Sequence, residues 1–259
     1  MAKTIFTKSI PQRNKSAIRM RVKRYGLKPY TQLRHLLVDK PVFILGSGTS
    51  LFFEKKLRVI FDYPVIAVNS SVLLTQWRDD GDKKNRFWLS NDALCRKWSY
   101  WPLVLRSNLN GIIRDSWGRY FKEVQDFYVF SGRGDWRNKF DVEENKLIGC
   151  SSVPSSLDMA IQLGCKLIFL LGVDHYFQKG KRYFWEYWEK DKRPVYKKPH
   201  MHPERHQKRI FKQNNEAYGV LKKVAHTLNI GVFNCNLKSH VNIFDKIDIE
   251  DALNYIKIS

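Results

Sequence analysis

The stretch Pro41-Val-Phe-Ile-Leu-Gly-Ser-Gly-Thr-Ser-Leu51 combines an apolar run with a turn that contains two glycines and hydroxyl side chains. Such a run, bounded by turn residues, is typical of a buried parallel strand that leads into a tight turn. We therefore expect a strand over residues 41–45, with small and polar residues at its carboxyl end. The other apolar runs of the chain show whether this pattern is repeated.

Five more segments have the same pattern, with β-branched or aromatic residues that end in polar turn residues: 64–71, 85–92, 126–132, 166–174 and 230–236. Helical patterns lie between the late strands, at residues 155–163, which begin with serine and stop at Gly164, and at residues 213–228. Strands that alternate with helices predict an α/β fold. We expect an open, mostly parallel, doubly wound (Rossmann-like) sheet with helices on both faces.

The domain organisation follows from a change in pattern near residue 41. The chain has 259 residues and is 43% hydrophobic, which is enough for one large domain with a buried core. We expect a single Rossmann-like catalytic domain over residues 41–259, with a lid at about residues 176–212. Residues 1–40 form a basic N-terminal extension with the pattern of an amphipathic helix, which can rest on a membrane surface or pack on the core.

The charge of the chain points to an anionic partner. The formal net charge is +21, and residues 1–40 contribute eleven Lys and Arg against one acid, or 11 − 1 = +10. Such a field attracts nucleic acid, anionic lipid or phosphorylated small molecules. A solvated surface without a partner is the alternative.

Cysteine usage and hydropathy predict a cytoplasmic protein that can sit peripherally at the inner face of a membrane. The four cysteines form no CxxC pair, as expected of reduced thiols. No apolar run reaches the roughly 18 residues of a membrane span. The N-terminus is polar and basic and lacks the apolar core of a secretory signal.

Small and polar residues gather where the predicted strands end. In an open α/β sheet, ligands bind outside the carboxyl ends of the strands, at the point where the strand order reverses. Glycine turns and helix N-termini offer N–H groups to a phosphate, and Asn or Ser side chains can bond a ribose or a base. The candidate nucleotide-binding residues are Gly46, Ser47, Gly48, Thr49, Ser50, Asn69, Ser70, Asn91, Asp92, Ser151 and Ser152. Ordinary turns and helix caps are the alternative at each position.

An Asp-His pair and a cluster of histidines are the candidates for catalysis. Asp174 and His175 end the strongest predicted strand, and His200, His202 and His206 lie further along the chain. Histidine can act as a general base or acid near pH 7. His and Asp together can also bind Zn²⁺ or Mn²⁺, although the spacing matches neither HExxH nor a zinc finger.

The lid segment combines positive charge with aromatic residues. Residues 176–212 contain twelve Lys and Arg against four acids, interleaved with Phe, Tyr and Trp. Such an insertion beside an active-site mouth can stack a base or sugar and hold phosphates. A floppy solvated loop is the alternative, and the cost of exposing so many aromatics argues against it.

The order of these motifs resembles the MptE-like domains (the DUF115 group) and, more distantly, the bacterial sialyltransferases of glycosyltransferase family 42. The resemblance covers roughly residues 41–253 and rests on segments 46–51, 68–70, 90–92, 149–152, 171–175, 200–203 and 233–253. The Gly172-Val-Asp-His175 segment followed by His200-Met-His-Pro203 is its most specific part.

The resemblance implies a glycosyltransferase that uses a nucleotide-activated sugar, with a CMP-linked nonulosonic acid as one donor, in envelope or surface glycan synthesis. A histidine after the lid is the base of the sialyltransferases. A straight alignment puts Lys212 near that place, so His202 or His206 would take the role on the acceptor, a glycan or small molecule. Ser152 and the lid would hold the departing phosphate, and residues 1–40 would keep the enzyme near an anionic membrane.

Two alternatives stay open from the sequence. MptE-like enzymes transfer pyrophosphate from a nucleoside triphosphate, ATP, to a 6-hydroxymethyl pterin, and here Asp92 and Asp174 would bind Mg²⁺. The sialyltransferase-like route predicts weak or no metal dependence. A nucleic-acid-binding protein on a degenerate enzyme fold is the alternative of another class, although the polar residues cluster at strand ends rather than along a stripe.

Overall fold

The computed structural model describes residues 22–75, 83–124, 126–137, 146–196 and 204–258. Strands and helices alternate along most of this length, joined by short 3-10 turns. In chain order they are β1 (Lys28–Pro29), β2 (Pro41–Leu45), α2 (Ser50–Phe53), β3 (Val65–Val68), α3 (Val72–Thr75), β4 (Arg86–Ser90), α4 (Trp101–Arg106), β5 (Asn110–Arg114), β6 (Tyr128–Arg133), β7 (Lys146–Ile148), α5 (Ser152–Gln162), β8 (Leu167–Leu171), α6 (Glu204–Thr227), β9 (Gly231–Asn234), β10 (Asp245–Lys246) and α7 (Ile249–Ile258).

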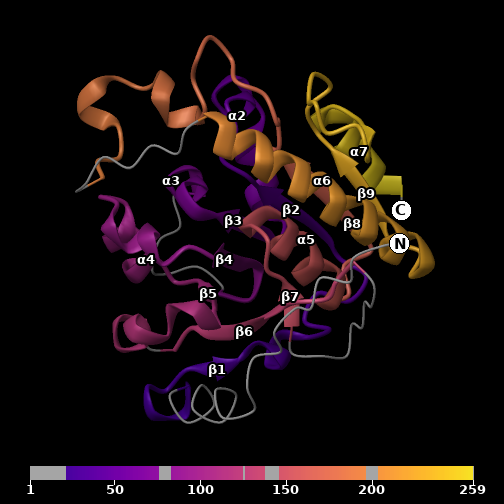
Figure 1. Ribbon diagram of the computed structural model, residues 1–259. Helices are drawn as coiled ribbons and strands as arrows, with labels where there is room; N and C mark the ends of the chain where they lie inside the picture. Colours follow the sequence, from indigo (N-terminus) through magenta and orange to yellow (C-terminus); the bar gives the residue numbers. More distant parts are fainter. Residues whose placement is uncertain (1–21, 76–82, 125, 138–145, 197–203, 259) are drawn as a thin grey trace, which may run out of the picture.

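The strands form one open sheet in the order β1-β6-β5-β4-β3-β2-β8-β9-β10, with β7 beside β6 (Figure 1). Every pair of these strands is parallel. The chain runs outward from β2 to β6 on one side, and from β8 to β10 on the other. The strand order therefore reverses between β2 and β8, where an open α/β sheet binds its ligand. The predicted α/β fold is confirmed.

All six strands predicted from the sequence are present, as β2, β3, β4, β6, β8 and β9, whereas β1, β5, β7 and β10 were missed. Strand β5 was not predicted because Gly111 interrupts its apolar run. The ring of Phe127 occupies the space beside Gly111, where an added Cβ would lie 2.4 Å from a ring carbon. Strands β1 and β10 have two residues each, which is too short for any periodicity.

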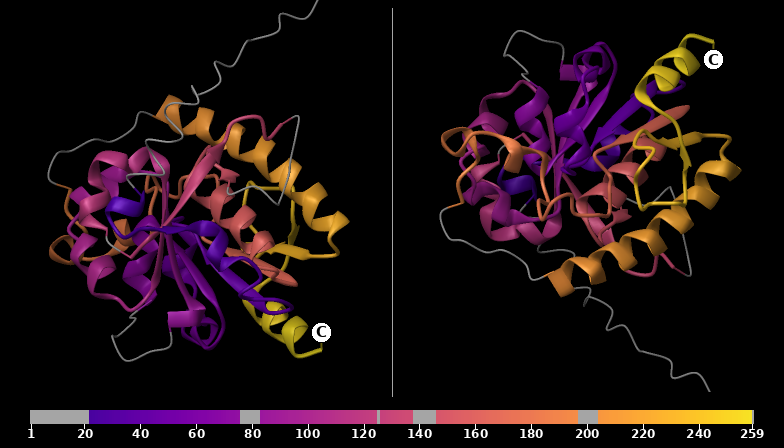
Figure 2. Two further views of the ribbon diagram at one scale, coloured as in Figure 1. Left: turned by 90° about the horizontal axis from the view of Figure 1, so that it is seen from below. Right: turned by 90° about the horizontal axis from the view of Figure 1, so that it is seen from above.

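The sheet is buried on both faces. Along β2, Val42 and Ile44 pack into a core with α5 and α6, while Phe43 and Leu45 pack into a second core with α2, α4 and α7. Side chains of a strand alternate between faces, so an uninterrupted apolar strand needs cover on both. The left view of Figure 2 shows α6 (orange) and α7 (yellow) on opposite sides of the sheet.

The described part of the basic extension, residues 22–40, belongs to this domain. Tyr30, Leu33 and Leu37 are buried in the core beside α5. The N–H of Leu37 donates to Leu163 O at 2.9 Å and that of His35 to Gln162 O, so this segment satisfies carbonyls at the end of α5. The described residues 22–40 therefore pack on the core. Residues 1–21 lie outside the described residues.

The lid segment is folded over the carboxyl ends of the strands as far as residue 196. Trp185, in a 3-10 turn over Phe184–Tyr187, donates from Nε1 to Ser70 Oγ at 3.2 Å. Its ring also packs edge-on against Trp98, with centroids 5.6 Å apart. Residues 197–203 lie outside the described residues. Helix α6 begins at Glu204, so the predicted lid of about residues 176–212 includes the first turns of this helix.

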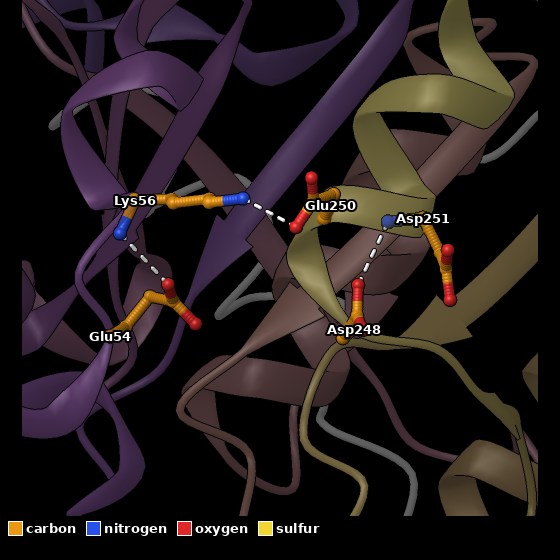
Figure 3. Close-up of polar contacts among 5 residues, drawn as sticks. All are labelled: Glu54, Lys56, Asp248, Glu250 and Asp251. Atoms are coloured by element: carbon orange, nitrogen blue, oxygen red, sulfur yellow. Dashed lines mark hydrogen bonds and ion pairs between the residues drawn. The ribbon is translucent and has the colours of Figure 1, made fainter.

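The last helix is fastened to the loop after α2 by polar contacts (Figure 3). Lys56 Nζ lies 2.5 Å from Glu250 Oε2, and the N–H of Lys56 donates to Glu54 Oε1. Asp248 Oδ1 accepts from the N–H of Asp251, which caps the first turn of α7. Among the described residues, no helix has the length and apolar character needed to cross a membrane.

Candidate functional site

The glycine turn after β2 is fitted against the backbone that follows β8. The N–H of Gly46 donates to Leu171 O at 2.8 Å, and the N–H of Gly48 donates to Gly172 O at 2.9 Å. An added Cβ would lie 2.4 Å from Gly172 O at position 46 and 2.3 Å from Asp174 Oδ2 at position 48. The expectation of N–H groups free for a phosphate is therefore wrong at these two positions. The glycines make room for a neighbouring strand end.

Asp174 locks this turn in place. It is 3% exposed, and it accepts from the N–H of Ser50 at 2.9 Å, from Ser50 Oγ at 2.6 Å and from Thr49 Oγ1 at 3.4 Å. Asn236, after β9, donates from Nδ2 to Asp174 Oδ1 at 2.8 Å. The carboxylate therefore joins the ends of β2, β8 and β9, and both of its oxygens already accept hydrogen bonds.

These contacts bear on the predicted metal ligands. Asp92, the other candidate, is exposed, and its Oδ1 accepts from the N–H of Leu94 as a cap for the turn after β4. Asp92 and Asp174 line different cavities. The two residues do not fit a shared Mg²⁺ site. In the part of the chain that is described, no group of three or more His, Cys, Asp or Glu side chains is placed to hold a metal ion.

The ends of β3 and β4 and the start of α5 are joined by side-chain hydrogen bonds. Asn69 has a left-handed backbone (φ 53°), which Asn tolerates, and Trp88 Nε1 donates to its carbonyl at 2.9 Å. Ser152 Oγ accepts from the N–H of Asn91 at 3.0 Å and donates to Asn69 Oδ1 at 3.4 Å. Asn91 Nδ2 donates to Ser155 Oγ. The predicted polar clusters at these strand ends do come together.

Two serines continue this cluster toward β2 and the lid. Ser47 Oγ donates to Val68 O, and Ser70 Oγ donates to Ser47 Oγ, both at 3.3 Å. Ser70 in turn accepts from Trp185, so the lid closes over this side of the cluster.

A cavity of about 260 Å³ opens beside these residues at the reversal point of the strand order. Its floor comes from the turns after β2, β3 and β8, and its walls from the N-terminus of α5, the lid and one face of α6. The lining residues are Ser47, Gly48, Val68, Asn69, Ser151, Ser152, Val153, Gly172, Val173, Asp174, His175, Tyr176, Phe177, Arg182, Tyr183, Gln207, Ile210, Phe211, Asn214 and Tyr218. A smaller cavity of about 110 Å³ adjoins it at Ser47, Asn69 and Tyr183 and contains Asp92.

The N-terminus of α5 faces the cavity without a capping side chain. Ser151 is the N-cap residue, but its Oγ donates to Asn214 Oδ1 of α6 at 2.8 Å instead of accepting from the helix. Ser155 and Ser156 bond to carbonyls of the loop and of the first turn. Ser152 and Val153 line the cavity with the positive end of the helix dipole, a suitable place for an anion.

His175 is held in a wall of the cavity as a neutral ring. It has a left-handed backbone (φ 55°), and its ring stacks on Phe211 at a centroid distance of 4.4 Å and on Tyr218 at 5.7 Å. Burial lowers the pKa of His175 from 6.5 to about 4. A histidine with this pKa is neutral at pH 7 and is a weak base. The stacking on Phe211 and Tyr218 favours a packing role for this ring over the predicted general-base role.

The other predicted histidines are His200, His202 and His206. His200 and His202 lie outside the described residues, and His206 lies in the first turn of α6, one residue before Gln207 of the cavity wall. The roles of His202 and His206 stay predictions.

The sequence missed the wall that α6 contributes. Gln207, Ile210, Phe211, Asn214 and Tyr218 all line the cavity. Their spacing of three, four and seven residues places them on one face of the helix. The polar Gln and Asn on this otherwise apolar face were a usable signal. Arg182 and Tyr183 of the lid line the cavity too, as expected of a basic, aromatic lid.

The free energy of unfolding should depend on pH because the ring of His175 is neutral in the folded protein. The neutral, half-buried ring of His175 stabilises the fold fully above pH 6.5, and this stabilisation is lost as the pH falls toward 4, because the unfolded chain takes up the proton first. Between pH 6.5 and pH 4, we expect the free energy of unfolding to fall by about 3 kcal/mol less in His175→Phe than in the unmodified protein. Urea unfolding of both proteins at several pH values between 4 and 6.5 measures it.

The pH dependence of the free energy of unfolding has to be compared between the variant and the unmodified protein. A second group, Asp158, changes the stability with pH in the opposite direction to His175. Burial raises the pKa of Asp158 from 3.8 to about 6, so its contribution is present below pH 3.8 and is lost as pH rises toward 6. The unmodified protein alone can therefore show a flat profile. A variant that keeps the same pH slope as the unmodified protein would contradict the buried neutral state of His175.

The fold is that of an open α/β domain with a cavity at the reversal point of its strand order. No protein-family model matches the chain, and no curated protein matches it significantly. One solved structure that resembles it is the sialyltransferase CstII from Campylobacter jejuni in complex with a substrate analogue, cytidine-5′-monophosphate. The TM-score is 0.46 at 18% identity, over 81% of this chain and 85% of that chain. This likeness is too low to assign a function.

Proposed function

We propose that the chain is a glycosyltransferase whose donor is a nucleotide-activated sugar, with a CMP-linked nonulosonic acid as the first candidate. The observation that carries this proposal is the convergence of Ser47, Asn69, Ser152 and the uncapped N-terminus of α5 on one cavity of about 260 Å³. A nucleotide has the matching chemistry, with hydroxyls and a base for the polar side chains and a phosphate for the helix N-terminus.

The proposed mechanism is a displacement at the anomeric carbon of the donor sugar. The acceptor hydroxyl forms the new bond and gives its proton to a base, and the nucleotide phosphate leaves with the bonding electrons. The N-terminus of α5 stabilises the charge that develops on the phosphate, and Arg182 of the lid adds positive charge at the cavity wall. His206 or His202 is the proposed base, since His175 is neutral and weakly basic in its wall.

The lid and the basic extension complete the proposal. The described lid residues cover the strand ends with aromatic rings, which excludes water from a reaction that would otherwise hydrolyse the donor. The excess of Lys and Arg in residues 1–40 would hold the enzyme at an anionic membrane.

A thermal-shift screen tests the nucleotide preference. CMP, CDP, UDP, GDP, ADP and ATP are each compared with Mg²⁺ and with EDTA, because a ligand that binds only the folded state raises the melting temperature. We expect stabilisation by CMP or CDP that survives EDTA. Stabilisation only by ATP with Mg²⁺ would favour a pyrophosphokinase that uses a pterin. No shift with any nucleotide would contradict the proposal, and salt-dependent binding of RNA or DNA would then favour the nucleic-acid alternative.

Ser152 gives a sharp mutational test of the same cavity. In Ser152→Ala we expect the Kd of the nucleotide selected by the screen to rise about tenfold, since the variant loses the hydroxyl that bonds Asn69 and Asn91. Ser156→Ala is the matched control, because this hydroxyl bonds Ser152 O one turn along the same helix and does not line the cavity. Calorimetric titration measures both. Equal Kd values in the two variants would place the nucleotide elsewhere.

A further inference from the structure

A second cavity lies beside the nucleotide cavity, on the other side of the turn that Asp174 locks. Its volume is about 380 Å³, and it is bordered by α2, the turn after β8, the start of the lid and the loop after β9. Gly172 and Tyr176 line both cavities. A molecule held here would therefore lie next to one held in the nucleotide cavity.

The polar groups of the second cavity suit an uncharged ligand. One acid, Glu54, and one base, Lys238, line it, so it carries no excess of either charge. Gln178 adds an amide and Tyr176 a hydroxyl, which lies 3.5 Å from Asn236 Nδ2. Amides and hydroxyls both donate and accept, as recognition of sugar hydroxyls requires.

An aromatic ring stands at the rim of the second cavity. Phe53 lines the cavity and is 51% exposed. Contiguous exposed apolar side chains with a polar rim mark ligand-binding grooves, and Phe53 is followed on this surface by its exposed neighbour Phe52. The ring of Phe53 meets Tyr187 edge-on at 5.1 Å, while its neighbour Phe52 stacks on Tyr187 at 4.8 Å. Phe52 thus holds the lid to α2 more closely, and it does not line the cavity.

We propose that the second cavity binds a neutral saccharide, which is the acceptor of the transfer proposed above. The C–H face of a pyranose ring packs on an aromatic ring such as Phe53, while Gln178 and Tyr176 bond its hydroxyls. A second nucleotide fits less well, because the cavity lacks both an excess of cations and the N-terminus of a long helix. The acceptor role rests on the proposed function; the saccharide site itself rests on the cavity.

Saturation-transfer NMR with maltotriose, chitobiose and N-acetyllactosamine tests the site. At least one of these neutral oligosaccharides is expected to bind the full chain. Phe53→Ala and Gln178→Ala are each expected to weaken that binding about tenfold, as for removal of a well-placed contact. Phe52→Ala is the matched control, because it breaks the same aromatic cluster on Tyr187 but leaves the cavity lining intact. CMP binding should be the same in all three variants.

The outcomes separate this inference from the proposed function. No binding by any of the three oligosaccharides would overturn the inference, and so would equal weakening in Phe52→Ala and Phe53→Ala, which would show that Phe53 only holds the lid. Saccharide binding with the expected variant pattern, but without any nucleotide-induced shift, would support the site and defeat the glycosyltransferase proposal. Nucleotide binding without saccharide binding would support the glycosyltransferase proposal and overturn the saccharide site.

Discussion

Replacing Asp174 by alanine is expected to lower the free energy of unfolding by about 4 kcal/mol, or roughly 10 °C in Tm. The carboxylate accepts from the N–H and Oγ of Ser50, from Thr49 Oγ1 and from Asn236 Nδ2, and it is almost fully buried. Its removal breaks these hydrogen bonds and removes the link between the ends of β2, β8 and β9. Such losses are among the largest that a single polar substitution produces.

Two further variants identify the cause of this loss. Asp92→Ala is the control, because Asp92 is an exposed cap whose loss costs about 1 kcal/mol. Asp174→Asn keeps the shape but presents an amide NH₂ group to donors, so an intermediate loss is expected. Differential scanning calorimetry compares the three in EDTA. If Asp174 were mainly an Mg²⁺ ligand, Asp174→Asn would melt like the unmodified protein in EDTA, contrary to this account.

Gly48→Ala is expected to cost about 2–4 kcal/mol and to abolish nucleotide binding, since overpacking here moves backbone as well as side chains. The added Cβ would lie 2.3 Å from Asp174 Oδ2 and 2.6 Å from Gly172 O. Gly48 lines the cavity that we propose for the nucleotide, so any shift of the turn also changes the floor of this cavity. Chemical unfolding and the thermal-shift screen measure the two effects.

Gly219→Ala is a matched control for the same substitution. Gly219 lies within α6, and an added Cβ there has no atom within 4 Å. Alanine is the better helix former, so this variant should gain up to about 1 kcal/mol. A Gly48→Ala protein as stable as the unmodified one would show that the turn yields easily and that Asp174 does not lock it.

The sequence predicted the strands that carry several β-branched or aromatic residues, and it predicted that their polar ends would meet. It did not reveal what the two glycines of the first turn were for. Local sequence shows that a close approach is needed at Gly46 and Gly48, but not which atoms approach, and these prove to be the backbone after β8 and Asp174. That partner is more than 100 residues away, and it is set by tertiary structure.

The rest of the site depends on packing between distant elements. The ring of His175 gains its low pKa from burial against Phe211 and Tyr218, which the segment Gly172–His175 alone does not show. The wall from α6 was missed because the helix begins at Glu204, nine residues before the predicted start at 213. The second cavity arises where α2 meets the loop after β9, which share no local signal.

Release of CMP from a CMP-linked nonulosonic acid tests the central claim most directly. The full chain is incubated with this donor in EDTA, with and without a neutral oligosaccharide, and free CMP is followed against a protein-free blank. The account predicts release above the blank that increases with the oligosaccharide and falls at least tenfold in Ser152→Ala but not in Ser156→Ala. Release no faster than the blank, together with Mg²⁺-dependent formation of AMP from ATP and a hydroxymethyl pterin, would contradict it.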